Sequence, residues 1–353
     1  MKKLLTIVVP SYNMEKYLRR GLESLIVQDS LLEMLDVIVV NDGSKDRTSE
    51  IAHEFAEKYP RSFRVVDKSN GHYGSCVNVG LKMAVGAYVR ILDADDSFNK
   101  PGLEHLLKFL DSIDIDDNDV VFFDTSVVYG NGEWTLSPPM RLPVNRVFSF
   151  DELPSPREVF WGQTRYAFKV EKLRQIGYLQ TEGVPYSDAE WIAFPWSNIT
   201  NMRYFPEVVS VVLVGRDGQT MNPKTYMRDF GIVVDLTRGM LRNLPVYTKN
   251  ANKEQSSYVR EKVLHMVDHV YETCLLCKPK ADLRAFDEEL RVSFPDFYGE
   301  GRCRIKLLFW RVDIVPFWRR HPHCCGCLVI MYRFQQFFRR PLGRIKRALI
   351  RTR

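Results

Sequence analysis

The sequence of 353 residues has no apolar run long enough to cross a membrane, which takes about 18–20 consecutive apolar residues. The first apolar run, 4–9, stops at Pro10 and is too short for the core of a signal peptide. The seven cysteines are not spread along the chain in the regular pattern of a disulfide framework, which argues against a disulfide scaffold and favours reduced thiols. We therefore expect a cytoplasmic protein in which 4–9 forms a buried first strand.

Acidic residues are almost missing from the C-terminal end. Residues 302–353 contain 14 Lys and Arg but one acid, Asp313, whereas residues 1–301 carry 36 basic and 43 acidic side chains. The net charge of +6 therefore averages an acidic body and a basic tail. Large apolar residues alternate with the basic ones, namely Trp310, Phe317, Trp318, Phe334, Phe337, Phe338 and Leu349. This pattern favours an amphipathic helix on an anionic membrane, with nucleic-acid binding as the alternative.

The body alternates strand-like and helix-like segments. Runs rich in Val, Ile and Phe predict strands at 4–9, 37–40, 63–66, 88–92 and 120–123. Amphipathic segments near 17–26 and 51–59 predict helices between them, the second capped by Ser44 or Asp46. Alternation of this kind is typical of an α/β fold with helices on both faces of a mostly parallel sheet. Ligands bind such sheets at the carboxyl ends of the strands.

The rest of the chain differs in pattern. Asn131-Gly132 predicts a hairpin turn between 127–129 and 134–136. A mostly helical stretch, 223–294, follows, with an apolar stripe of Val259, Val263, Val267, Val270 and Cys274. We predict three parts: an α/β domain over 1–220, a helical region over 221–300 and a basic amphipathic tail over 301–353.

Acidic and polar loops follow the predicted strands. Asp93-Ala94-Asp95-Asp96 could be a solvated turn, but it directly follows a buried strand, where uncompensated carboxylates repel one another. Mg²⁺ or Mn²⁺ would remove that repulsion, and both ions commonly leave part of their shell to substrate phosphates. Asp42, in Asn41-Asp42-Gly43-Ser44, could be a turn residue, or its carboxylate could accept a hydrogen bond from an imide N–H such as that of uracil.

These loops belong to an ordered set of motifs. The set comprises Thr6-Ile7-Val8-Val9-Pro10-Ser11-Tyr12-Asn13, Val39-Val40-Asn41-Asp42-Gly43-Ser44-x-Asp46-x-Thr48, Asn70-Gly71-x-x-Gly74-Ser75-x-x-Asn78-x-Gly80, Ala84-x-Gly86 and Leu92-Asp93-Ala94-Asp95-Asp96. In order and spacing it resembles the family 2 glycosyltransferases, whose GT-A fold has a Rossmann-like sheet. The resemblance is strong over about 4–98 and continues more weakly to about residue 220. It implies an inverting transferase that moves a sugar from a nucleotide-sugar donor, expected to be a UDP-sugar, to a hydroxyl of a glycan or lipid-linked glycan.

The resemblance also implies roles for individual residues. The donor nucleotide would contact Pro10, Tyr12, Asn13, Asp42, Asn78, Asp93 and Arg216, and the metal, Mn²⁺ or Mg²⁺, would bind Asp95 and Asp93. Asp93 is expected near the ribose, and Asp96 would support the loop. One departure concerns the identity of the nucleotide base: many members have an Arg two residues after the position of Ser75, where this sequence has Val77. The contact that this Arg makes must be absent or supplied elsewhere.

Inverting transfer needs a base for the proton of the acceptor hydroxyl, and a metal-bound diphosphate leaves without a general acid, unlike the leaving group of a glycosidase. In the family, the catalytic base is the second residue of a Glu-Asp pair, in a loop that follows the sheet in the sequence. Here Ser187 replaces the Glu and Asp188 takes the position of the base. Asp188 could instead cap the following helix, and Glu190 is the nearest alternative acid. Arg216 resembles a basic residue that closes over the diphosphate, although a plain surface loop fits equally well.

Several other features leave alternatives open. Trp161 and Trp191 could offer faces to an acceptor sugar, but core aromatics are commoner. The cluster His321-x-His323-Cys324-Cys325-x-Cys327 could bind a metal or be acylated, and incidental thiols are the simpler interpretation. A sugar-phosphate nucleotidyltransferase should have a Gly-rich loop with Arg and Lys at 10–13, which is missing, and a dehydrogenase needs Gly-x-Gly-x-x-Gly there. A non-catalytic nucleotide-sugar-binding or scaffold protein at the membrane would not need Asp188.

Overall fold

The computed structural model describes residues 2–130, 132–154, 162–216, 219, 227–276, 281–301, 304–307, 310–321 and 330. The chain divides into two compact units, Met1–Glu261 and Lys262–Arg353, and the boundary falls inside the helix α10 (Lys253–Leu276). The division at 220 and 300 that the sequence suggests stays a prediction.

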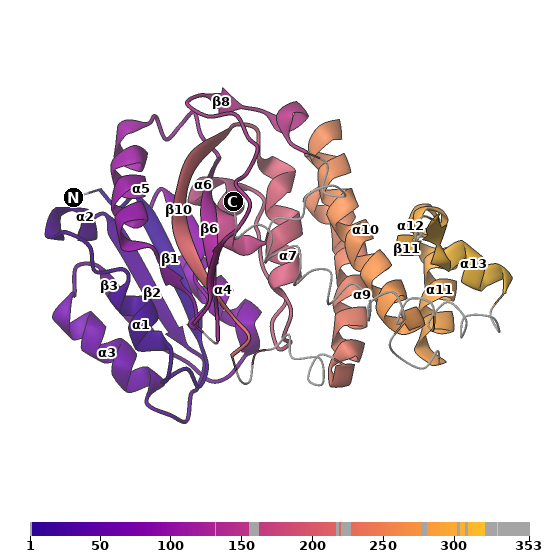
Figure 1. Cartoon of the computed structure of the whole chain (residues 1–353), viewed down its shortest axis with the longest axis horizontal. Helices are drawn as coiled ribbons and strands as arrows, with labels where there is room; N and C mark the ends of the chain where they lie inside the picture. Colours follow the sequence, from indigo (N-terminus) through magenta and orange to yellow (C-terminus); the bar gives the residue numbers. More distant parts are fainter. Residues whose placement is uncertain are drawn as a thin grey trace, which may run out of the picture. The chain divides into compact units, whose positions relative to one another are not determined.

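The first unit is built on one large sheet, to which ten strands of the described residues belong (Figure 1). Its strands are β1 (Leu5–Ser11), β2 (Leu35–Asn41), β3 (Phe63–Asp67), β4 (Tyr88–Ile91), β5 (Ser97–Phe98), β6 (Val120–Tyr129), β7 (Trp134–Leu136), β8 (Val147–Phe148), β9 (Tyr166–Lys169) and β10 (Met202–Val214). The main path runs β3-β2-β1-β4-β9-β6-β10-β5. The first four of these are parallel, whereas β9 is antiparallel to both of its neighbours. All five predicted strands are confirmed.

Helices cover both faces of this sheet, because successive side chains of a strand point to opposite faces. On one face, Ile7 and Val9 of β1 belong to a core cluster that includes side chains of α1, α3 and α5. On the other face, a Cβ on Gly80 of α4 would lie 2.3 Å from Val8 Cγ1, so this helix packs directly on β1. The α-helices that lie wholly in the described part of the unit are α1 (Leu18–Glu23), α2 (Asp29–Leu32), α3 (Thr48–Lys58), α4 (His72–Met83), α5 (Lys100–Ser112), α6 (Val170–Gln175), α7 (Asp188–Ala193) and α9 (Phe230–Tyr247). The predicted α/β architecture is confirmed.

The turns of this unit follow the predicted local chemistry. The Asp46 carboxylate accepts the backbone N–H of Thr48 at 3.0 Å, at the start of α3. β6 and β7 pair as the predicted hairpin, and Gly132 has a φ of 81°, which favours glycine. The Gly130 N–H after β6 donates to the Val214 carbonyl at 2.9 Å. This contact brings the hairpin next to the loop that follows β10.

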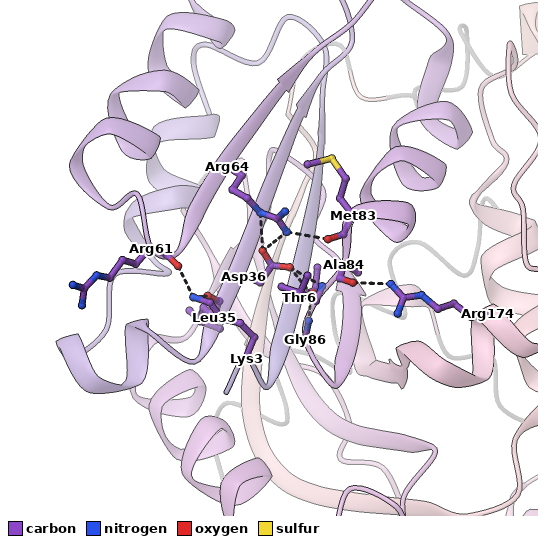
Figure 2. A network of polar contacts seen from close by, with 11 residues as sticks. Lys3, Thr6, Leu35, Asp36, Arg61, Arg64, Met83, Ala84, Gly86 and Arg174 are labelled. Carbon is purple, nitrogen blue, oxygen red and sulfur yellow. Dashed lines mark hydrogen bonds and ion pairs between the residues drawn. The ribbon is translucent and has the colours of Figure 1, made fainter. Parts of the chain in front are cut away.

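A buried carboxylate joins elements at the amino ends of β1 and β2 (Figure 2). Asp36 is 2 % exposed and accepts hydrogen bonds from the Thr6 hydroxyl at 2.8 Å and from the Arg64 guanidinium at 2.5 Å. Arg64 also donates to the Met83 carbonyl at 3.0 Å, and the Gly86 N–H donates to the Thr6 hydroxyl at 2.9 Å. These bonds hold the end of α4 and the following turn. The Ala84-x-Gly86 motif therefore has a structural role at the edge opposite the polar loops.

The second unit is mostly helical up to residue 300, as predicted. Beyond α10 it contains α11 (Ala281–Ser293), α12 (Pro295–Glu300), β11 (Arg304–Leu307), β12 (Trp310–Asp313) and α13 (Ile314–Arg320). β11 and β12 pair as an antiparallel hairpin, so the expected amphipathic helix is wrong for this part of the tail. Trp318 is 4 % exposed, and its ring lies 6.5 Å from that of Tyr271. Trp318 therefore packs inside the unit instead of facing a membrane.

Polar contacts hold α13 in this second unit. The Arg319 guanidinium donates to the Asp287 carboxylate at 2.7 Å and to the Tyr271 hydroxyl at 3.0 Å. Where the structure describes the chain, no helix is both long and apolar enough to serve as a membrane span.

Candidate functional site

The polar loops after β1 and β2 meet at one edge of the sheet. Asn13 connects them: its backbone N–H donates to the Ser44 hydroxyl at 3.0 Å, and its side-chain oxygen accepts the Lys45 N–H at 2.8 Å. Pro10 is buried at the end of β1, in register with Val40, whereas Tyr12 is 46 % exposed. The structure thus brings the predicted residues Pro10, Tyr12 and Asn13 together, with the Tyr12 ring accessible to a ligand.

Asp42 lies beside them as a buried, charge-paired carboxylate. It is 3 % exposed, and its Oδ1 accepts hydrogen bonds from Lys68 Nζ at 2.7 Å and from the Gly71 N–H at 2.9 Å. Lys68 also donates to the Ser75 hydroxyl at 2.9 Å. Lys68 therefore supplies a positive charge next to Asp42, whereas Val77 is fully buried in the core. Asp42 is therefore a buried, paired carboxylate and not a solvated turn residue, and its contact with the donor base stays a prediction.

The acidic loop after β4 is buried and crowded. Asp93 Oδ1 accepts hydrogen bonds from the Tyr73 hydroxyl at 2.9 Å and from Gln163 Nε2 at 3.1 Å. Asp95 pairs with Arg216, with 2.5 Å between Oδ2 and Nε, and Asp96 accepts the backbone N–H of Leu213 at 2.8 Å. Burial, followed by the charge of Asp95, raises the pKa of Asp93. The pKa of Asp96 is raised well above its usual value by burial and by the charge of Asp93.

A buried arginine compensates part of this negative charge. Arg90 of β4 is 1 % exposed, donates to the Ser210 hydroxyl and lies 4.5 Å from the ring centre of Phe98. Burial lowers its pKa to about 10, an effect opposed by the charges of Asp96 and Asp93. It therefore stays protonated at neutral pH beneath the acidic loop.

These residues fit a divalent cation only in part. Within the described chain, no group of three or more His, Cys, Asp or Glu side chains could hold a metal ion by itself. Asp95 offers a hard oxygen ligand, but its carboxylate is paired with the Arg216 guanidinium, with which a metal ion would compete. Both Asp93 oxygens already accept hydrogen bonds from Gln163. The donor set suits a cation whose remaining ligands come from substrate phosphates.

Asp188 stands at the first position of α7, half-buried at the same site. Burial, reinforced by the charge of Asp93, raises its pKa to about 7. The charges of Asp93 and Asp188 both act on the Tyr73 hydroxyl, whose pKa is raised well above its usual value, chiefly by burial. Tyr73 contacts Asp93 directly, and the charge of Asp188 acts on the Tyr73 hydroxyl. A carboxylate of this pKa is well suited to accept a proton near neutral pH.

Comparison with known proteins identifies the part of the chain that holds most of these residues, with Asp188 and Arg216 beyond it. The model of the Glycosyl transferase family 2 matches residues 6–171. Those residues form a family 2 glycosyltransferase domain.

Curated relatives agree with this assignment. The minor teichoic acid biosynthesis protein GgaB of Bacillus subtilis is 40% identical over 106 residues, 30% of this chain and 12% of GgaB. An uncharacterized glycosyltransferase of the same organism, EpsJ, is 29% identical over 194 residues, 53% of this chain and 54% of the relative. The curated relatives named here are thus covered to about half of their length or less.

The crystal structure of Staphylococcus aureus TarS 1-349 superimposes with a TM-score of 0.57 at 20% identity, over 81% of this chain and 77% of that one. This likeness confirms the GT-A type fold. A second structure of TarS 1-349, in complex with UDP-GlcNAc, has a TM-score of 0.54 at 20% identity and covers 84% of this chain and 78% of that one.

Several residues of the family 2 domain site escape a sequence-based search. Lys68, Tyr73, Arg90 and Gln163 contact or neutralise the predicted acids, but they come from other segments than the loops themselves. Lys68 is one residue past β3, at the same sheet edge as the other strand ends, and this position is the one signal that could have found it.

Other residues considered in the sequence analysis lie around α7 and the segment before it, beyond the matched residues 6–171, or contact that segment. The Asn78 side chain, on α4, donates hydrogen bonds to Gln180 and Glu182 of the segment before α7. Glu190 is 1 % exposed, and its carboxylate accepts the Thr181 N–H at 2.6 Å, which favours Asp188 as the base. Trp191 is fully buried against Phe168 and Tyr178 and is a core residue. The predictions for Trp161 and for 322–327 of the His-Cys cluster fall outside the described residues.

Proposed function

We propose that this chain is an inverting glycosyltransferase that moves a sugar from a UDP-sugar donor to a hydroxyl of a cell-surface glycan or a lipid-linked glycan. The observation that carries the proposal is the meeting of Asp42, the acidic loop and Asp188 at one edge of the sheet. GgaB and TarS, by their names, act on teichoic acid and poly(ribitol-phosphate), which supports a cell-wall glycan as acceptor. The structure of TarS with UDP-GlcNAc makes that nucleotide sugar the first donor to test.

The proposed reaction assigns a task to each part of the site. The buried Asp42, held by Lys68, would accept the imide N–H of uracil, and Tyr12 would stack on the base. The acceptor oxygen would attack the anomeric carbon while Asp188 takes its proton, and the diphosphate would leave with the electrons of the broken bond. Asp95, with Asp93 next to it, would hold Mn²⁺ or Mg²⁺, which supplies positive charge for the leaving diphosphate. Arg216 would add a guanidinium to that charge.

A screen of nucleotide sugars for slow hydrolysis tests this function without knowledge of the acceptor. We expect release of UDP from one UDP-sugar in the presence of Mn²⁺ or Mg²⁺, loss of that release with EDTA, and no release from GDP-mannose. Asp42→Asn should weaken UDP binding because it removes the charge that Lys68 pairs with. Asp116→Asn is the matched control, since Asp116 is an exposed partner of Lys169. UDP binding without turnover on any donor or acceptor would instead indicate a binding protein.

We also propose that the end of the chain binds an anionic membrane on its cytoplasmic face. Residues 322–353 contain eight Lys and Arg and no acid, together with four aromatic residues. Each basic residue near an anionic surface contributes about 1 kcal/mol. We expect the full chain to float with phosphatidylglycerol vesicles but not with phosphatidylcholine vesicles. Changing Arg339, Arg340, Arg344, Lys346 and Arg347 to Gln should abolish flotation while donor hydrolysis persists, and unchanged flotation would contradict the proposal.

A further inference from the structure

The segment 180–188, which leads to the proposed base, is packed against one face of α4. Gly71 at the start of that helix, Gly74 and Asn78 are spaced by three and four residues, so they share this face. The Gly183 N–H donates to the Gly71 carbonyl at 2.8 Å, and a Cβ on Gly74 would lie 2.0 Å from the Thr181 carbonyl oxygen. The segment thus lies against backbone where a side chain on α4 would displace it.

The Asn78 side chain makes the polar contacts of this face. Its Oδ1 accepts the backbone N–H of Gln180 at 2.8 Å, and its Nδ2 donates to the Gln180 carbonyl at 2.9 Å. Nδ2 also donates to the Glu182 carboxylate at 2.8 Å. An amide that pairs with both backbone groups of one residue sets the position and the orientation of that residue, as a neighbouring strand would.

Buried hydrogen bonds then connect Gln180 to the start of α7. The Gln180 side chain donates to the Ser187 hydroxyl at 3.1 Å, and the Glu190 carboxylate accepts the Thr181 hydroxyl at 2.8 Å. Gln180, Ser187 and Glu190 are each at most 2 % exposed. A shift at Gln180 would therefore be passed on to the residue after Ser187, which is Asp188.

The backbone between these anchors is strained. Tyr186 has a φ of 66°, a left-handed conformation that is unfavourable for a bulky side chain. Such a conformation persists when the surrounding contacts determine it, and it is found preferentially at functional sites. Contacts with α4 and α7 hold the segment on both sides of Tyr186. This agrees with a segment fixed in one position, which in turn fixes the position of Asp188.

We infer that Asn78 is a positioning residue for Asp188 and not a donor-binding residue. Its amide holds Gln180, the Gln180 side chain holds Ser187, and this chain of bonds places the Asp188 carboxylate where it meets the acceptor hydroxyl. The inference rests on the proposed function, in which Asp188 is the base. Misplacing a reacting group by about 1 Å can lower a rate by about 10²-fold.

Asn78→Ala tests the inference through the separation of turnover from binding. We expect kcat of transfer to fall by about 10²-fold while the Kd for UDP and the donor KM change less than about threefold. Asn78→Asp has the same shape and keeps an acceptor for the Gln180 N–H but loses both donated bonds, so it should also lower kcat in a folded protein. Asn198→Ala is the matched control, because it removes amide bonds to Lys172 and Gln175 away from the site. It should leave kcat unchanged.

A double-mutant cycle with Asp188→Asn separates positioning from a general loss of stability. If Asn78 acts through Asp188, adding Asn78→Ala to Asp188→Asn should lower kcat no further. Additive losses, or weaker UDP binding by Asn78→Ala alone, would overturn the inference and leave the proposed function standing. Full activity of Asp188→Asn alone would instead overturn the role of the base.

Discussion

Replacing Asp188 with Asn is expected to lower kcat of sugar transfer by about 10²–10⁴-fold while UDP still binds. The amide has nearly the same shape as the carboxylate but cannot accept the proton of the acceptor hydroxyl. Transfer rates with saturating donor, together with calorimetric titration of UDP, measure the two effects separately. Intact turnover in this variant would contradict the assignment of Asp188.

The pH dependence gives a second measure of the same residue. Because the pKa of Asp188 is raised to about 7, a proton occupies the base below that pH, and kcat/KM should fall about tenfold per pH unit on the acid side. Above about pH 7 the carboxylate is ionised and kcat/KM should level off. An acid limb that persists unchanged in the residual activity of Asp188→Asn would assign the titration to another group.

We expect Asp188→Asn to be no less stable than the parent chain at neutral and alkaline pH, so unfolding would not explain a loss of activity. The folded-state pKa of about 7 lies above the usual value of about 3.9 for an unfolded chain, so the fold favours the protonated form. The contribution of Asp188 to stability is therefore greatest below about pH 4 and is lost as the pH rises to about 7. The neutral Asn variant should be at least as stable as the parent chain at pH 8, which thermal unfolding at pH 5 and pH 8 can check.

Replacing Asp95 with Asn is expected to remove the response of the enzyme to divalent cations and to lower turnover by about 10²-fold or more. Asp95 is 7 % exposed, and its carboxylate is paired with Arg216 at 2.5 Å. A divalent cation bound to Asp95 would therefore compete with the Arg216 guanidinium for the carboxylate. Rates measured against Mn²⁺ and Mg²⁺ concentration test this expectation, with Asp116→Asn as the control. Full activity of the parent chain in EDTA would contradict it.

Arg216→Ala should strengthen the binding of free Mn²⁺ at the same site, whereas Asp95→Asn should weaken it. Without the guanidinium next to Asp95, Mn²⁺ alone should bind more tightly, because it no longer competes with a fixed positive charge. Turnover should nevertheless fall, since the leaving diphosphate loses one of its positive partners. Calorimetric titration of Mn²⁺ in the absence of donor distinguishes the two effects. Weaker Mn²⁺ binding in Arg216→Ala would contradict this account of the ion pair.

Local patterns in the sequence predict much of this site. Alternating apolar runs and amphipathic segments predict the strands and helices, because side-chain burial repeats with the period of each element. Once the first strands are known to be parallel, the loops at 10–13, 41–44 and 93–96 must meet at one edge. The pKa values of Asp93 and Asp96 are raised chiefly by burial, and the repulsion expected within Asp93-x-Asp95-Asp96 adds to that effect.

Other parts of the site depend on contacts between residues far apart in the chain. Gln163 reaches Asp93 and Arg216 reaches Asp95 because β9 and β10 return to the sheet next to or beyond β4, an order that no local pattern contains. The hairpin of β11 and β12 likewise forms where charge and aromatic content suggested a helix.

The sequence by itself thus determined the elements, the edge that holds the loops and the acids that the loops carry, because burial periodicity and charge are properties of neighbouring residues. Only the tertiary structure decided which partner each acid has and which residue holds the proposed base in place. Asn78 shows the difference: its motif is local, but its hydrogen bonds go to Gln180 and Glu182, more than 100 residues along the chain. Such pairings follow from the packing of whole elements, which brings remote backbone and side chains within hydrogen-bonding distance.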